Sequence, residues 1–103
     1  MTCMSRRTVA LLALLLLFAS TTACGGRRAT REDCRQILDR LVDLELQEWG
    51  FRDPALAARW RAQAEAAHAA ELAACEGQRI PRTALACVQA AASSEEISHR
   101  CFR

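Results

Sequence analysis

The chain has 103 residues, a formal net charge of +2 and six cysteines, and 25% of its residues are charged. This length is that of one small domain. The near-balance of charge excludes a protein that binds nucleic acid through a strongly basic face. All 14 basic residues are arginine, which we interpret as a coding preference towards Arg and Ala. No stretch carries a recognisable catalytic constellation, so the sequence is more informative about location and fold than about activity.

The first 23 residues have the three parts of a secretory leader. Arg6 and Arg7 form a positive start, residues 9–19 are an unbroken apolar stretch, and small or hydroxyl residues then lead to Ala23. An apolar helix of that length reaches about 16 Å, whereas the hydrocarbon core of a bilayer is about 30 Å thick. We therefore predict a signal peptide over residues 1–23 and no permanent span.

Ala23 and Cys24 fit the last two positions of a lipobox, and the leader resembles that of bacterial lipoproteins. The resemblance implies cleavage before Cys24 and attachment of lipid, including palmitate, to this residue. Thr21 departs from the family pattern, in which leucine usually stands three residues before the cysteine. Ordinary cleavage after Ala23, giving a periplasmic or secreted protein without lipid, therefore stays open. Gly25 stands where an inner-membrane retention signal would resemble aspartate, so we expect an outer-membrane anchor facing the periplasm or the surface.

Residues 24–29 are predicted to form a short, flexible, lipid-anchored tether, followed by a helical domain over residues 30–103. Such a tether extends about 20 Å at most, so the domain should lie close to the bilayer. Arg27, Arg28 and Arg31 could contact anionic headgroups. They could equally serve only to keep the tether solvated.

A first helix is predicted over residues 31–48, because apolar side chains recur there at helical spacing. Thr30 is the expected N-cap, and Asp33 stands three residues later, close to a capping box. Gly50 should follow the helix in a left-handed conformation. These signals together define both ends of the helix.

Aromatic residues stand on both sides of Gly50, at Trp49 and Phe51. A left-handed Gly50 would bring Phe51 against Leu46, the contact that accompanies a Schellman motif. We expect the two aromatic side chains to fill the first turn of a helical hairpin. The alternative is an exposed aromatic patch that contacts a partner.

A second helix is predicted from Pro54, after the N-cap residue Asp53, to about Cys75, with Gly77 as its stop signal. Alanine, the best intrinsic helix former, fills 11 of these 22 positions. One apolar arc at 100° per residue is expected to face the first helix: Leu56, Trp60, Ala64, Ala67, Ala70 and Ala74.

Glu71 falls inside that arc, and a buried carboxylate is costly unless it is paired. We expect a salt bridge to an arginine of the first helix, such as Arg35. The rival interpretation gives Glu71, His68 or the cysteines a role in an enzyme or redox factor. His68 and His99 are themselves expected to be surface residues.

A third helix is predicted from Pro81 to about Ala92, and a short fourth helix from Ser93, with Glu96 completing a capping box. No stretch alternates polar and apolar residues as a half-buried strand would. The predicted fold is therefore all-α, a small antiparallel bundle of three to four helices stapled by disulfides.

Four cysteines remain if Cys3 is removed with the leader and Cys24 carries lipid, and an exported chain favours disulfides. Positions at similar distances from the turn at Ser93 lie level on its two arms. This favours Cys87–Cys101 and leaves Cys34–Cys75, although Cys75–Cys87 with Cys34–Cys101 is nearly as good. The cysteines lack the C-x₂-C spacing of a zinc site or a redox-active dithiol.

The layout from residue 31 onwards resembles that of uncharacterised small cysteine-containing helical lipoproteins of myxobacterial type. The resemblance is carried by segments 33–46, 50–56 and 85–101, and it implies caps, helix faces and cysteines but no activity. We predict a membrane-anchored envelope lipoprotein, a non-enzymatic helical module that binds or braces another envelope component. No cofactor, metal or nucleic acid is expected, and a non-lipidated secreted protein or an envelope enzyme is the alternative.

Overall fold

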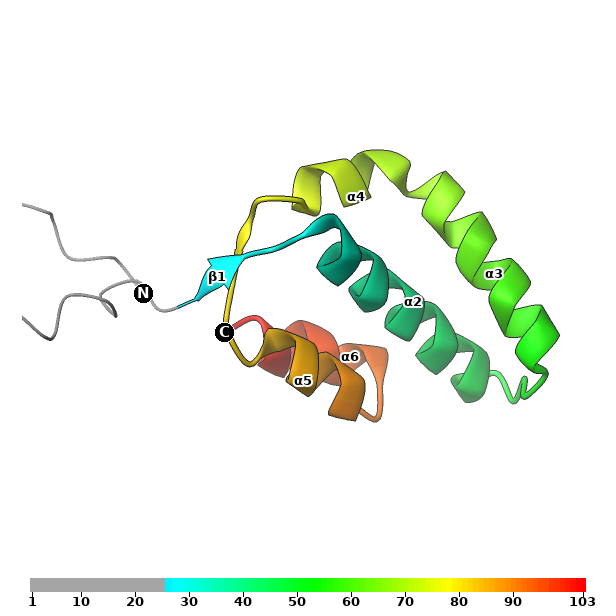
Figure 1. The fold of residues 1–103 in the computed structure, drawn as a ribbon. Helices are drawn as coiled ribbons and strands as arrows, with labels where there is room; N and C mark the ends of the chain where they lie inside the picture. Colours follow the sequence, from blue (N-terminus) through cyan, green and yellow to red (C-terminus); the bar gives the residue numbers. More distant parts are fainter. Residues whose placement is uncertain (1–25) are drawn as a thin grey trace, which may run out of the picture.

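The computed structural model describes residues 26–103, so the predicted leader and the predicted lipid site at Cys24 lie outside the described residues. The predicted all-α class is confirmed in the described part (Figure 1). The elements in chain order are β1 (Arg27–Arg28), α2 (Arg31–Glu48), α3 (Pro54–Ala67), α4 (Ala69–Cys75), β2 (Arg79–Ile80), α5 (Ala84–Ala90), α6 (Ser94–Glu96) and the π-helix η1 (Ile97–Cys101).

Helix α2 is the central element, with α3 and α4 along one side and α5, α6 and η1 along another (Figure 1). Its start is the predicted capping box: the Asp33 amide donates to Thr30 Oγ1 over 3.1 Å, and the Thr30 amide donates to Asp33 Oδ2 over 2.8 Å. Its end is the predicted Schellman motif, because Gly50 has φ +84° and the Phe51 amide donates to the Leu46 carbonyl over 2.8 Å.

The predicted second helix is two helices in the structure. It begins as expected, with Pro54 at the first turn and Asp53 Oδ1 accepting from the Ala55 amide over 2.9 Å. The chain then leaves helical geometry at His68, where φ is −108° and ψ is 27°, and α4 continues in a new direction (Figure 1). No proline or glycine stands at this bend, so the local sequence carries no break signal. The bend brings the end of α4 to the start of α2.

The predicted flexible tether is wrong for its described part, residues 26–29. Arg27 pairs with Ile80 and Arg28 with Arg79 in a two-stranded antiparallel ladder. Ala29 extends the pairing, donating its amide to the Gln78 carbonyl over 2.7 Å, and is only 3% exposed. These residues therefore belong to the folded domain, whose predicted boundary at residue 30 is too late. Alternation could not reveal strands this short, because a two-residue strand has no period.

Gly26 shows how closely the two strands approach. Its φ is +131°, and a Cβ at this position would lie 2.7 Å from the Ile80 carbonyl oxygen. Any larger residue would therefore push the chain away from β2. The point at which the chain enters the domain is thus set by backbone contact.

The C-terminal part differs from the prediction mainly in its boundaries. Helix α5 begins at Ala84, three residues after the predicted start at Pro81. Ser93 caps α6 as predicted, accepting from the Glu96 amide over 3.1 Å, while Glu96 Oε2 accepts from the Ala92 amide over 2.8 Å. The chain then widens into η1, which turns the side chains of Ile97 and Cys101 inward.

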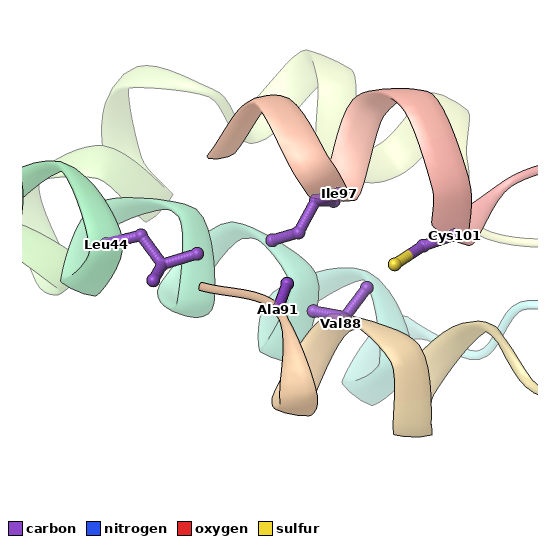
Figure 2. Packing of buried hydrophobic residues seen from close by; sticks show 5 residues of the cluster. All are labelled: Leu44, Val88, Ala91, Ile97 and Cys101. Carbon is purple, nitrogen blue, oxygen red and sulfur yellow. The ribbon is translucent and has the colours of Figure 1, made fainter. Parts of the chain in front are cut away.

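Two apolar clusters form the core of the described domain. One lies between α2, α5 and η1 and is shown in Figure 2: Leu44, Val88, Ala91, Ile97 and Cys101, each at most 2% exposed. The other lies beside the strand ladder and consists of Ala29, Cys34, Ile80 and Ala84. Each cluster contains one buried cysteine, Cys101 in the first and Cys34 in the second, with its disulfide partner packed against the cluster.

Candidate functional site: a tryptophan-lined groove on α2

The four cysteines of the described chain form two disulfides and leave no free thiol there. Cys34 pairs with Cys75, with Cα atoms 6.1 Å apart, and Cys87 pairs with Cys101, with Cα atoms 5.4 Å apart. This is the pairing that the spacing favoured. The alternative, Cys75–Cys87 with Cys34–Cys101, is not present in the structure. The sulfurs therefore link α2 to α4 and α5 to η1.

Glu71 is not a buried carboxylate, because its side chain is 71% exposed. Its nearest basic partner is His68, whose Nδ1 lies 3.8 Å from Glu71 Oε1. The expected salt bridge to Arg35 is wrong: Arg35 instead lies 3.4 Å from Glu32 and 3.8 Å from Glu65. The bend at His68 explains the error, since it rotates α4 relative to the arc that one straight helix would present.

The two histidines are surface residues, as predicted. The His68 side chain is 53% exposed, and that of His99 is 64% exposed. His99 Nε2 lies 3.9 Å from Glu95 Oε1, one turn away on the same segment. Within residues 26–103 no three His, Cys, Asp or Glu side chains gather as metal ligands would.

Two of the three arginines considered for headgroup contact bond within the domain. Arg27 pairs with the Asp33 carboxylate, its Nη2 lying 3.1 Å from Oδ1. The Arg27 hydrogen bond, aided by the Thr30 amide, holds the pKa of Asp33 well below its usual range. Arg28 Nη1 donates to the Gly77 carbonyl over 3.3 Å. These contacts fasten the ladder to the start of α2.

The expected aromatic plug at the α2–α3 turn is wrong. Trp49 is 59% exposed and Phe51 is 49% exposed, so neither fills the turn. Trp49 instead meets Trp60 of α3, with ring centroids 6.4 Å apart and ring planes at 80°. Trp60 is itself 42% exposed. The structure therefore has the exposed aromatic patch that was the alternative interpretation.

The two indoles stand at one end of a groove of about 390 Å³ on the surface of α2. Helix α2 forms its floor, α3 forms one wall, and Ser94 at the start of α6 contributes to the other side. The floor residues of α2 are Leu38, Leu41, Val42, Glu45, Leu46 and Trp49, and the α3 side adds Trp60, Gln63, Ala64, Ala67 and His68.

The groove exists because α3 covers this face of α2 only in part: Val42 and Leu46 are buried at its floor, whereas Trp49 is exposed. None of the residues of α3 is buried, and one close ion pair joins the two helices: Arg61 Nη1 lies 2.9 and 3.1 Å from the two oxygens of Asp43. Asp39 of α2 lies against Glu65 of α3, and its burial and the Glu65 carboxyl raise the pKa of Asp39 to about 6. The uncovered part of the groove is therefore its indole end, where Trp49 and Trp60 are exposed.

Sequence reasoning placed Trp60 on an inner arc and Trp49 in the turn, so it missed their pairing. One usable signal was present: Leu38, Val42, Glu45 and Trp49 recur at three and four residues and share one face of a helix. That face is only partly covered by α3, half of whose residues are alanine. The pattern could not tell which part of it stays uncovered.

No protein-family model, curated protein or solved structure matches this chain. Helices long and apolar enough to cross a bilayer are absent from the part of the chain that the structure describes.

Proposed function

We propose that the mature chain is an envelope lipoprotein, anchored through lipid on Cys24, whose helical domain binds another envelope component through the tryptophan-lined groove. The observation that carries the binding role is the groove itself. A domain this small has few large apolar side chains, and three of its four exposed large ones are Trp49, Phe51 and Trp60 around the α2–α3 turn. Concentrated exposed aromatic side chains are characteristic of interaction surfaces.

The position of the groove fits an anchored protein. The chain enters the domain at β1, beside the start of α2, whereas Trp49 follows the far end of that helix (Figure 1). An 18-residue helix is about 27 Å long at 1.5 Å per residue. A lipid on Cys24, two residues before Gly26, would hold the start of α2 near the bilayer and present the aromatic end away from it.

The side chains of the groove support binding over catalysis. Of the residues that the sequence offered for catalysis only His68 lines it, since Glu71 lies outside its lining and the described cysteines are paired. The carboxylate of the lining, Glu45, stands one turn from Trp49, at the other end from His68. General acid–base or nucleophilic catalysis needs at least two groups within hydrogen-bond reach of one substrate. The groove offers a wide apolar floor instead, which is typical of a recognition site.

The anchor is tested by changing Cys24→Ser and separating membranes from soluble envelope contents. The variant should leave the membrane fraction and lose incorporation of labelled palmitate, while the unchanged chain keeps both. High salt screens the arginines near the anchor. A variant that still sediments with washed membranes would refute the lipid anchor.

The binding role is tested by site-specific crosslinking in intact cells. A photoreactive side chain at Gln63, on the groove wall, should give a defined adduct. The same group at Gln89, an equally exposed glutamine on α5 outside the groove, serves as the matched control. Equal adducts from both positions, or none from Gln63, would contradict the proposal.

A further inference from the structure

We propose that the Trp49–Trp60 end of the groove binds a quaternary ammonium group whose attached apolar chain lies along the floor of α2. This inference rests on the proposed binding role and names the ligand chemistry of that same site. It is carried by three features of the groove: two indoles at right angles, one carboxylate beside them, and an apolar floor that continues from them.

The two indole rings provide the cation-binding surface. Their centroids are 6.4 Å apart and their planes are at 80°, so the two rings border a corner. Aromatic faces carry negative electrostatic potential, and a cation within about 6 Å of a ring centroid is attracted to it. Tryptophan gives the strongest such attraction, and boxes of aromatic rings are the usual receptors for quaternary ammonium groups. Both rings are exposed enough to be reached from solvent.

The charge of the groove favours a cation at this end. Among the described residues that line it, Glu45 is the one carboxylate. Glu45 precedes Trp49 by four residues on α2, so the two side chains are neighbours on the same face. The single basic side chain of the lining, His68, follows Trp60 by eight residues on α3, which is about 12 Å along a helix. Within the lining, an anion at the indole end would therefore have a like charge, Glu45, as its neighbour.

The rest of the floor accounts for a chain on the ligand. From Trp49 back to Leu38 the floor covers three helical turns, about 16 Å, and the side chains between are mainly apolar. The groove volume of about 390 Å³ exceeds what a small ammonium head needs. A ligand with both a quaternary head and an alkyl chain would therefore occupy the corner and the floor together.

The protein reports on this site by its own fluorescence, because Trp49 and Trp60 are the two tryptophans of the chain and it has no tyrosine. The full chain carrying Cys24→Ser, exported and purified with its disulfides, would be titrated with octyltrimethylammonium. We expect a saturable change in fluorescence. Octan-1-ol, which supplies the chain without the charge, should bind at least tenfold more weakly, as should tetramethylammonium, which supplies the head alone.

Substitutions separate the charge from the apolar surface. Glu45→Gln should weaken octyltrimethylammonium binding about fivefold to tenfold and leave octan-1-ol unchanged, since one charge–charge contact is lost. Glu48→Gln, an exposed glutamate of α2 outside the groove, is the matched control and should change neither. Trp60→Phe keeps an aromatic face and should retain binding, while Trp60→Leu should lose about tenfold; far-UV circular dichroism checks that each variant is folded.

The proposal is overturned if octan-1-ol binds as tightly as octyltrimethylammonium, or if Glu45→Gln and Glu48→Gln behave alike. The natural source is then distinguished with two probes: a short-chain phosphatidylcholine, which carries acyl chains, and glycine betaine, which does not. Binding of the first alone identifies the ligand as a lipid. Equal binding of both identifies it as a free solute and shows that the apolar floor of α2 does not contribute to binding. Failure of every ammonium probe with a persistent Gln63 crosslink would refute this ligand and leave the proposed binding role standing.

Discussion

The two sides of α2 are packed by different means. On the α5–η1 side, Leu44, Val88 and Ile97 interdigitate and are at most 2% exposed (Figure 2). On the α3 side, no residue of α3 itself is buried, and Arg61–Asp43 is the closest ion pair between the helices. On the first side both partners contribute fully buried side chains, whereas on the second the buried side chains, Val42 and Leu46, come from α2 alone.

This difference explains how a small domain keeps an apolar groove open. The layer of α3 and α4 is fixed at one end by the turn after Gly50 and at the other by the Cys34–Cys75 disulfide. With both ends held, α3 needs less apolar contact to stay in place. Its alanine-rich surface then leaves part of the α2 face uncovered. The tightly packed core and the proposed binding surface thus lie on opposite sides of the same helix.

The largest expected loss of stability follows from removing the Cys34–Cys75 disulfide. The double change Cys34→Ser with Cys75→Ser should lower the free energy of unfolding by about 4 kcal/mol, because 41 residues separate the cysteines and long loops lose more entropy on closure. The matched change Cys87→Ser with Cys101→Ser removes a disulfide whose cysteines are only 14 residues apart, and it should cost about 3 kcal/mol. Urea unfolding measures both, and a larger loss from the second pair would contradict the assignment of roles.

The packing difference is tested by the same substitution on the two sides. Leu44→Ala removes a side chain that is 1% exposed and should cost about 3 kcal/mol through lost burial and a cavity. Leu56→Ala on α3 removes a half-buried leucine and should cost less than about 1 kcal/mol. Equal losses in urea unfolding would show that the α3 side is as tightly packed as the other.

Local signals in the sequence predicted both ends of α2 and the start of α3. The capping box at Thr30, the left-handed Gly50 and the proline start of α3 each depend on a few neighbouring residues. The favoured cysteine pairing also followed from spacing around one turn. Such features are readable because the groups that interact stand close together in the chain.

Features set by long-range contact were missed. The bend at His68 has no local breaker, and the ladder of Arg27–Arg28 with Arg79–Ile80 joins residues about fifty positions apart in two-residue strands. The exposed Trp49–Trp60 pair was missed for the same reason, since the turn geometry decides which ring α3 covers. A pattern of apolar residues predicts which face of a helix is buried, whereas the extent to which that face is covered depends on the tertiary structure.

The turn that joins the two sides of the groove is tested at Gly50. Its φ is +84° and a Cβ there would touch nothing within 4 Å, so any cost of substitution comes from the backbone and not from a clash. Gly50→Val should lower the free energy of unfolding by roughly 1–2 kcal/mol, since a β-branched residue resists positive φ. Gly50→Asn, which tolerates this conformation, should cost less than half as much. Equal losses would show that the turn rearranges.

The smallest expected effect is a pH dependence of stability. Asp39, on the α3 side of α2, and Asp33, beside the strand ladder, contribute to it in opposite directions. Asp39 faces Glu65 across the α2–α3 interface, with Arg35 and Arg61 also within its electrostatic reach, and burial with the Glu65 carboxyl raises its pKa to about 6 from an ordinary value of 3.8. A raised pKa means that the folded state binds the proton more tightly than the unfolded state. The resulting stabilisation is complete below pH 3.8 and is lost as the pH rises through about 6.

Asp33 acts in the opposite direction, because Arg27 lowers its pKa and its stabilisation is lost in acid, below its ordinary range. Thermal unfolding should therefore show greatest stability near pH 4, with a loss of about 1 kcal/mol between pH 5 and pH 7.5 after allowance for the partial exposure of Asp39. Asp39→Asn should remove that loss and be the more stable protein at pH 7.5, whereas Asp53→Asn, at the exposed N-cap of α3, should leave the slope between pH 5 and 7.5 unchanged. A flat profile in the unchanged protein would show that Asp39 and Glu65 are separated in solution, and that the α3 side is held by its ends alone.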